Sequence, residues 1–152
     1  MNKLENIDFS PEFSKAFEIL NNSSDNLFIT GKAGTGKSTF LEYFRQNTKK
    51  RVAVVAPTGV AALNVRGQTI HSFFKFRPQF FDKTSIKVKK DRKVYAKLDM
   101  IIIDEISMVR ADLFAAIEHF LRLNGPKQGQ PFGGVQICVI GDLFQLPPII
   151  SY

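Results

Sequence analysis

Four short runs of apolar residues divide the chain into regular blocks. They cover residues 27–30, 51–56, 100–103 and 135–140, and each is apolar nearly throughout instead of alternating with polar residues. A continuous apolar run of this length is typical of a strand that is covered on both faces, as in a parallel sheet. The pattern therefore predicts four buried strands.

The segments between these runs carry apolar residues at helical spacing. Ser10 and Pro11 form a helix start, and the pattern predicts helices over 11 to about 21, 37 to about 47, 59–65 and 111–123. Residues 129–134 are predicted to form a loop. Strands that alternate with helices predict an α/β fold, with a parallel sheet flanked by helices and joined by right-handed crossovers. We expect one domain over residues 1–152.

A glycine-rich sequence follows the first predicted strand. Gly31-Lys32-Ala33-Gly34-Thr35-Gly36-Lys37-Ser38 matches the pattern of a phosphate-binding loop. Glycines let the backbone wrap around phosphates, and the start of the next helix adds a partial positive charge. We expect Lys37 to contact the β and γ phosphates of ATP and Ser38 to bind Mg²⁺. The predicted ATP-binding residues are Gly31, Ala33, Gly34, Thr35, Gly36, Lys37, Ser38 and Thr39.

Two acidic residues, Asp104 and Glu105, follow the third predicted strand. The carboxyl edge of a parallel sheet is where ligands bind. We expect Asp104 to hold Mg²⁺ and Glu105 to orient and deprotonate the attacking water, which predicts a hydrolase. With the phosphate loop, these residues predict a P-loop NTPase.

The sequence Gly141-Asp142-Leu143-Phe144-Gln145-Leu146-Pro147-Pro148 follows the fourth predicted strand. Gln145 is the candidate for a catalytic contact with the γ phosphate, and a purely structural loop is the alternative.

The net charge of +7 is concentrated in residues 75–97, which hold nine basic and two acidic residues. Such a basic insertion suits a polyanion, and a solvated flexible loop is the alternative. We expect it to be partly disordered without DNA. The aromatic residues beside it either stack on single-stranded nucleic acid or form a small core of their own. They are Phe74, Phe76, Phe80 and Phe81.

Cysteine content and hydropathy indicate an intracellular protein. Cys138, the lone cysteine, lies in an apolar run and is expected to be a small buried side chain. The N-terminal residues lack the apolar core of a signal peptide, and no apolar stretch reaches the roughly 18 residues of a membrane span. We expect no membrane partner and, if the source is bacterial, a location in the cytoplasm at the nucleoid.

Four strings together resemble the superfamily 1 helicases, and most closely the petite-integration-frequency class related to RecD-type helicases. They are TGKAGTGKST, APTGVAALNVRGQTIHSFF, IIIDEISMV and GDLFQLPP, and the resemblance runs from about Phe9 to Pro148. It implies a RecA-like motor domain of a 5′-to-3′ DNA helicase that uses ATP and Mg²⁺ and acts on single-stranded DNA and duplex junctions.

The resemblance also implies DNA contacts at Pro57, Thr58 and Gly59 and at His71 and Phe73. His71 has a structural role as its alternative. Such helicases usually read adenine with a glutamine early in the first helix, where this chain has Phe13. Phe13 is expected in the core, with stacking on a base as the alternative.

The resemblance further implies a second RecA-like domain that donates an arginine to the ATP site, and no such domain follows within residues 1–152. We therefore expect the chain alone to be a monomer that binds nucleotide weakly, with negligible ATPase and no unwinding activity. An assembly ATPase of the AAA+ type and a non-catalytic DNA-binding module are the competing interpretations.

Overall fold

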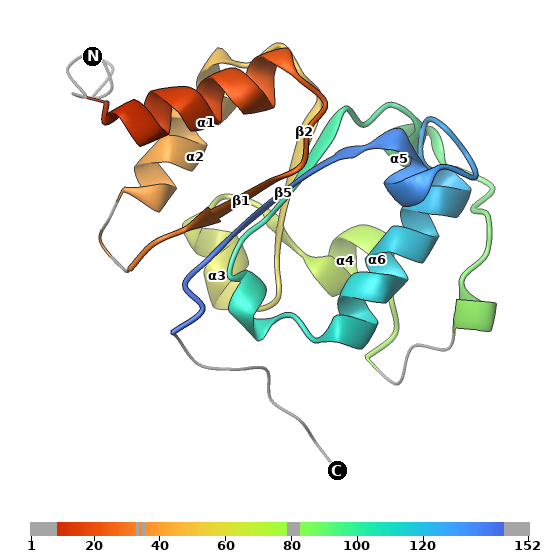
Figure 1. Ribbon diagram of the computed structural model, residues 1–152. Coiled ribbons are helices and arrows are strands. Elements are labelled where there is room, and N and C mark those ends of the chain that lie inside the picture. The colour runs from red at the N-terminus through yellow and green to blue at the C-terminus, as the bar shows by residue number, and fades with distance from the viewer. Residues whose placement is uncertain (1–8, 33, 35, 79–82, 145–152) are drawn as a thin grey trace.

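A five-stranded parallel sheet forms the centre of the molecule (Figure 1). The computed structural model describes residues 9–32, 34, 36–78 and 83–144. The strands are β1 (Leu27–Thr30), β2 (Val52–Ala56), β3 (Gln68–Thr69), β4 (Met100–Ile103) and β5 (Gln136–Gly141), in the spatial order β1-β5-β4-β2-β3. The predicted parallel α/β sheet is confirmed, and β5 separates β1 from β4.

Helices cover both faces of this sheet (Figure 1). They are α1 (Pro11–Asn22), α2 (Lys37–Asn47), α3 (Gly59–Asn64), α4 (Ile70–Phe74), α5 (Lys93–Ala96) and α6 (Ala111–Asn124). Three short 3₁₀ turns complete the described elements, namely η1 (Lys83–Ser85), η2 (Ile106–Met108) and η3 (Pro131–Gly134). The four predicted helices and the four predicted strands agree with the bounds of α1, α2, α3, α6 and of β1, β2, β4, β5 within a few residues.

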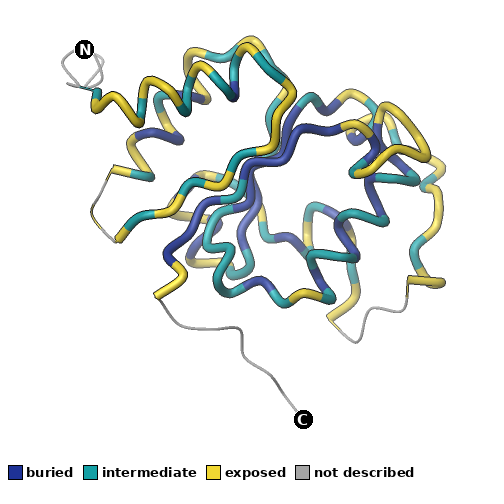
Figure 2. The backbone as a smooth tube through the Cα atoms, in the orientation of Figure 1, coloured by how far each residue is buried: buried dark blue, intermediate teal, exposed yellow. Residues whose placement is uncertain are grey.

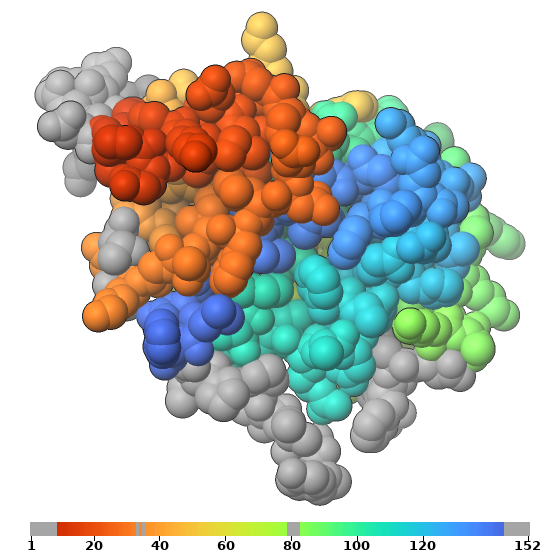
Figure 3. All heavy atoms as spheres, viewed as in Figure 1, coloured from red at the N-terminus to blue at the C-terminus, as the bar shows by residue number. Residues whose placement is uncertain are grey.

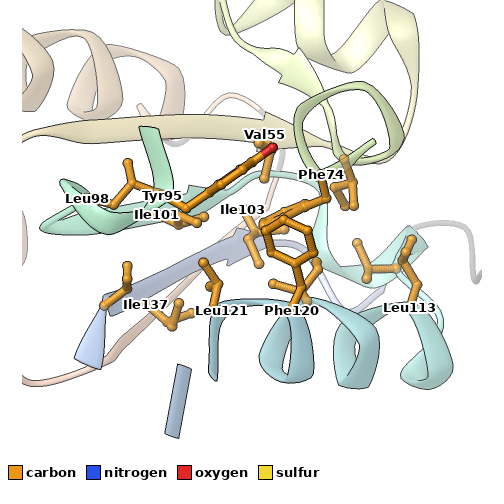
Figure 4. Packing of buried hydrophobic residues seen from close by; sticks show 14 residues of the cluster. Val55, Phe74, Tyr95, Leu98, Ile101, Ile103, Leu113, Phe120, Leu121 and Ile137 are labelled. Atoms are coloured by element: carbon orange, nitrogen blue, oxygen red, sulfur yellow. The ribbon is translucent and has the colours of Figure 1, made fainter. Parts of the chain in front are cut away.

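Alternate residues of the central strands enter two separate cores. Ile101 and Ile103 pack with α4, α5 and α6 on one face, where Phe74 and Phe120 are buried (Figure 4). Met100 and Ile102 pack with α1 and α2 on the other face. The central strands are therefore largely buried (Figure 2), which is why the sequence is apolar without alternation.

Two side chains that the sequence predicts to be buried, Cys138 and Phe13, lie in or against these cores. Cys138 is fully buried, and burial raises the pKa of its thiol to about 12, as expected of an inert buried cysteine. Phe13, on α1, has its ring centroid 4.6 Å from that of Phe9 and 4.5 Å from that of Phe40 on α2. These contacts pack the half-buried Phe13 against the core, in line with the expectation.

The basic segment is packed where the structure describes it. Ile86 lies against the core, and the Tyr95 hydroxyl donates to the Phe73 carbonyl oxygen at 2.7 Å. The backbone N–H of Lys89 donates to the buried Asn124 side chain at 2.7 Å. Residues 83–97 thus return along α6 as a packed connection, because apolar side chains spaced among the lysines reach the core. Partial disorder of the segment 75–97 without DNA stays a prediction.

Phe74 and Phe76 belong to this main core. Phe74 is fully buried, and the Phe76 ring stacks on it with centroids 5.3 Å apart. Full burial removes Phe74 from any surface that could stack on nucleic acid, and the half-buried Phe76 packs against the same core and not a separate one. Phe80 and Phe81 lie outside the described residues.

Along the part of the chain that the structure describes, no helix combines the length and apolar character required to cross a lipid bilayer.

Candidate functional site

Side chains from three strand ends meet in one cavity at the carboxyl edge of the sheet. The cavity has a volume of about 370 Å³. It is lined by Gly34, Gly36, Lys37, Ser38, Thr39, Asp104, Glu105, Gly141 and Asp142. The ends of β1 and β5 emerge side by side at the surface (Figure 3), with Thr30 paired to Gly141. The fold therefore brings together residues that lie more than a hundred positions apart in the sequence.

The loop that enters α2 depends on glycine. Gly34 has a φ of 82° and Gly36 a φ of 90°, both in the left-handed region that residues with a side chain rarely adopt. Gly36 stands at the N-cap of α2, where no side chain caps the first N–H groups. Those N–H groups and the helix dipole favour an anion at this point.

The Lys37 ammonium turns back onto the same loop. Its Nζ donates to the Gly31 carbonyl oxygen and to that of Lys32, the latter at 3.3 Å. Carbonyl oxygens carry only partial negative charge, so phosphate oxygens would be stronger acceptors for this cation.

The Asp104 and Glu105 carboxyl groups stand close to each other and to Lys37. Burial raises the pKa of Asp104, while a backbone hydrogen bond from Glu105 and the charge of Lys37 act in the opposite direction. The pKa of Glu105 is raised mainly by burial and then by Asp104. Both groups therefore favour a nearby positive charge.

The backbone directly after β4 makes a sharp turn at the two carboxylates. Glu105 has a φ of 54° and a ψ of 46°, which turns the chain sharply into η2. The turn lies so close to β5 that a Cβ on Gly141 would stand 2.7 Å from the Ile106 side chain. Glycine at this position lets the two strand ends approach.

Asp142 is a site residue that the sequence reasoning missed. It lines the cavity, is 7% exposed, and its Oδ1 accepts a hydrogen bond from the Phe144 N–H at 2.9 Å. Like Asp104, it is an acid directly after a buried strand, and that signal could have identified it. Gln145, chosen from the same string, lies outside the described residues, as do Ala33 and Thr35.

The cavity offers hard oxygen donors to a divalent cation. The Ser38 hydroxyl and the Asp104 carboxylate both line it, and oxygen ligands are those that Mg²⁺ prefers. No group of three His, Cys, Asp or Glu side chains within the described ranges is arranged to hold a metal alone. These residues fit a cation that is shared with phosphate oxygens.

A second group of predicted residues lies beyond β2 and β3. Thr58 is the N-cap of α3, and its Oγ1 accepts a hydrogen bond from the Ala61 N–H at 3.2 Å. The hydroxyl proton of Thr58 can still be donated to a phosphate. Pro57 is half-buried and Gly59 is exposed, so this turn is accessible.

His71 and Phe73 lie on α4, which follows β3 directly. His71 is half-buried, and the Phe73 ring packs edge-on against Phe74 and Tyr95. These contacts place Phe73 against the core, and a contact of either residue with DNA stays a prediction.

Comparison with known proteins identifies close relatives. The model of the family described as PIF1-like helicase matches residues 11–152. The chain is 40% identical over 136 residues to the ATP-dependent DNA helicase PIF1 of Emericella nidulans, covering 82% of this chain and 18% of that protein. It is 36% identical over 149 residues to the ATP-dependent DNA helicase Pif1 of Bdellovibrio bacteriovorus, covering 94% of this chain and 34% of that one.

A solved structure shows the same fold. The Pif1 helicase from Bacteroides in complex with ADP-AlF3 and ssDNA superposes with a TM-score of 0.82 at 36% identity, covering 96% of this chain and 35% of that chain. The chain thus spans about a third or less of the proteins it matches, and it shares their RecA-like P-loop fold. With a family model that matches nearly its whole length, the chain belongs to the PIF1-like helicase family.

Proposed function

We propose that this chain is the ATP-binding motor domain, the first of two RecA-like domains, of a 5′-to-3′ DNA helicase. The parent protein would couple ATP hydrolysis to translocation on single-stranded DNA and to unwinding at duplex junctions. The observation that carries the proposal is the single cavity lined by Lys37, Ser38, Asp104 and Glu105. A relative solved with ADP-AlF3 and ssDNA supports the same pair of ligands.

ATP would enter with its phosphates against the loop from Gly31 to Thr39. Lys37 would leave the Gly31 and Lys32 carbonyl oxygens and bind the β and γ phosphates, since a full negative charge is the better acceptor. Backbone N–H groups at the start of α2 would hold the remaining phosphate oxygens.

Ser38 and Asp104 would hold Mg²⁺ together with those phosphates. When bound, Mg²⁺ supplies charge neutralisation at the transferred phosphoryl group. Glu105 would accept the proton of the attacking water, and its raised pKa suits a general base better than that of an ordinary carboxylate. Gln145 would sense the γ phosphate.

The turn Pro57-Thr58-Gly59 would contact the backbone of single-stranded DNA through the Thr58 hydroxyl, with His71 and Phe73 on the adjoining α4. The basic segment 75–97 would attract the same polyanion. The turn Pro57-Thr58-Gly59 follows β2, and α4 follows the neighbouring β3. A single-stranded DNA molecule could therefore contact the turn and α4 together.

Catalysis by the motor would also need an arginine from a second RecA-like domain. In related phosphoryl-transfer enzymes such a residue contributes on the order of 10³ to 10⁵ in rate. We expect residues 1–152 alone to be a monomer with weak nucleotide binding and negligible ATPase, and a steady ATPase from this chain would contradict that expectation.

The test is the ATPase activity of the full-length parent, with and without single-stranded DNA, beside Glu105→Gln. We expect strong stimulation by DNA, abolished in the variant while ATP binding survives. Glu18→Gln, an exposed position on α1, serves as the matched control and should behave as the parent does. Robust activity that ignores nucleic acid would overturn the helicase assignment in favour of an assembly ATPase.

A further inference from the structure

A hollow of about 340 Å³ lies between α2 and the end of α3, and it shares Ser38 and Thr39 with the cavity at the phosphate loop. Ser38, Thr39 and Glu42 of α2 line one side, and Asn64, Val65 and Arg66 line the other. The two helices belong to different proposed sites, because α2 begins at the phosphate loop and α3 begins at the turn proposed to contact DNA. A side chain that spans this hollow therefore connects the phosphate loop with the turn proposed to contact DNA.

Arg45 spans it with charge-assisted hydrogen bonds. From the last turn of α2, its Nη1 donates to the Val65 carbonyl oxygen at 2.7 Å and to the Arg66 carbonyl oxygen at 3.2 Å. These oxygens lie just beyond the C-terminus of α3, where the helix dipole favours a positive charge. Such bonds are stronger than those between neutral groups.

The end of α3 that Arg45 holds is a tight turn. Arg66 has a φ of 51°, and Gly67 donates its N–H to the Ala62 carbonyl oxygen at 2.8 Å. A Cβ on Gly67 would stand 2.4 Å from the Val54 carbonyl oxygen, so the turn is pressed directly onto β2. Movement of the turn would therefore move the whole of α3.

The six-residue α3 is too short to hold its orientation by helical hydrogen bonds alone. It is fixed at its start by the Thr58 cap and at its end by Arg45 and the Gly67 turn. Six residues of helix span about 9 Å, so the Arg45 contact lies only that far from the Thr58 turn. Lys37 lies two helical turns from Arg45 on the same rigid helix, about 12 Å away.

We propose that Arg45 is a positioning residue that couples the phosphate-binding helix to the DNA-contact turn Pro57–Gly59. It holds the end of α3 on α2, so that a shift of α2 when nucleotide binds is passed to Thr58. The inference rests on the proposed function, because it assumes that Thr58 contacts DNA and Lys37 contacts ATP.

The experiment uses the full-length parent and measures ATPase rate against single-stranded DNA concentration and against ATP concentration. Arg45→Met removes the hydrogen bonds and keeps most of the aliphatic side chain. We expect the DNA concentration for half-maximal stimulation to rise about tenfold, the effect of losing one charge-assisted hydrogen bond, while the KM for ATP changes much less. Arg45→Lys, which can still donate to one carbonyl, should restore at least half of this loss.

Glu42→Gln provides the matched control. Glu42 lines the same hollow and forms an exposed ion pair with Arg66 at 3.8 Å, a type of pair that contributes little. This variant should keep the DNA dependence of the parent.

Three results would overturn the coupling role. The first is an Arg45→Met protein with the DNA dependence of the parent. The second is an equal loss in the DNA and ATP dependences together with a lower melting temperature, which would show that Arg45 only stabilises the fold. The third is a full-length parent whose ATPase is not stimulated by DNA at all. That result would overturn the proposed function itself, and it can be told apart from the other two because it appears in the parent before any variant is compared.

Discussion

Asp142 has two effects at the phosphate cavity that act in opposite directions. Its carboxylate fixes the chain after β5 by accepting the Phe144 N–H. The same negative charge raises the pKa of Glu105, although less than burial and Asp104 do. An uncharged side chain of the same shape would keep the first effect and remove the second.

Asp142→Asn and Asp142→Ala should therefore differ in stability. Asparagine retains an oxygen that can accept the Phe144 N–H, so we expect Asp142→Asn to be as stable as the parent or slightly more so. Alanine leaves that N–H without its acceptor and should cost about 1 kcal/mol. Urea denaturation of the two variants measures the difference, and equal midpoints would show that the hydrogen bond contributes nothing.

At the scale of elements, the local sequence predicts those helices and strands whose caps, glycines or apolar runs lie within the element itself. The helix α2 begins where glycines end, and α1 begins with the Ser10 cap, whose side chain accepts the Phe13 N–H at 3.3 Å. The strands β4 and β5 lie in continuous or nearly continuous apolar runs. In contrast, β3, α4 and α5 are only two to five residues long and were not predicted as separate elements. Elements this short take their stability from tertiary contacts, which a local pattern does not contain.

The packing of the basic connection to β4 also depends on tertiary contacts. The fully buried Asn124 on α6 binds this connection. The Asn124 Oδ1 accepts the Lys89 N–H at 2.7 Å, and Nδ2 donates to the Lys87 carbonyl oxygen at 3.3 Å and to that of Phe120 at 3.0 Å. The Arg92 guanidinium adds a hydrogen bond to the Gly125 carbonyl oxygen at 3.0 Å.

Asn124→Ala should release this connection. Loss of the buried amide leaves the Lys89 N–H without its acceptor, and we expect a cost of about 2 kcal/mol. Limited trypsin digestion followed by mass spectrometry should show faster cleavage between residues 87 and 93. Asn47→Ala is the matched control, since Asn47 is an exposed asparagine at the end of α2 that bonds only to the Tyr43 carbonyl oxygen among the contacts described here. Equal cleavage in both variants would contradict the role of Asn124.

At the scale of the whole molecule, one lysine joins the end of α1 to the start of β5 at the amino edge of the sheet, opposite the candidate phosphate cavity. The Lys50 Nζ donates to the Leu20 and Ser23 carbonyl oxygens and to the Gln136 Oε1, each at 2.6 Å. The Gln136 Nε2 in turn donates to the Asp25 carbonyl oxygen at 2.6 Å. Burial lowers the pKa of Lys50, so these acceptors offset part of the cost of placing a charge there.

Lys50→Met should therefore destabilise the whole domain. Methionine has a similar length but cannot donate, and three acceptors would lose their partner at a cost of about 2 to 3 kcal/mol. The neighbouring Lys49 is exposed, and Lys49→Met should change the free energy of unfolding by less than about 0.5 kcal/mol. Thermal and urea denaturation of both variants provide the measurement. A loss of the same size in both would mean that the network at Lys50 has no special role.

The sequence by itself determined the fold class and predicted most of the residues that line the candidate phosphate cavity. Buried parallel strands require continuous apolar runs, and a phosphate loop requires glycines and a lysine in consecutive positions, so both are written in local order. Three features were decided only by the tertiary structure: the presence of Asp142 in the cavity of Lys37 and Asp104, the packing of residues 83–97, and the bridge from Arg45 to α3. Each depends on which strands and helices become neighbours, and the spatial order β1-β5-β4-β2-β3 sets that by burying two cores at once.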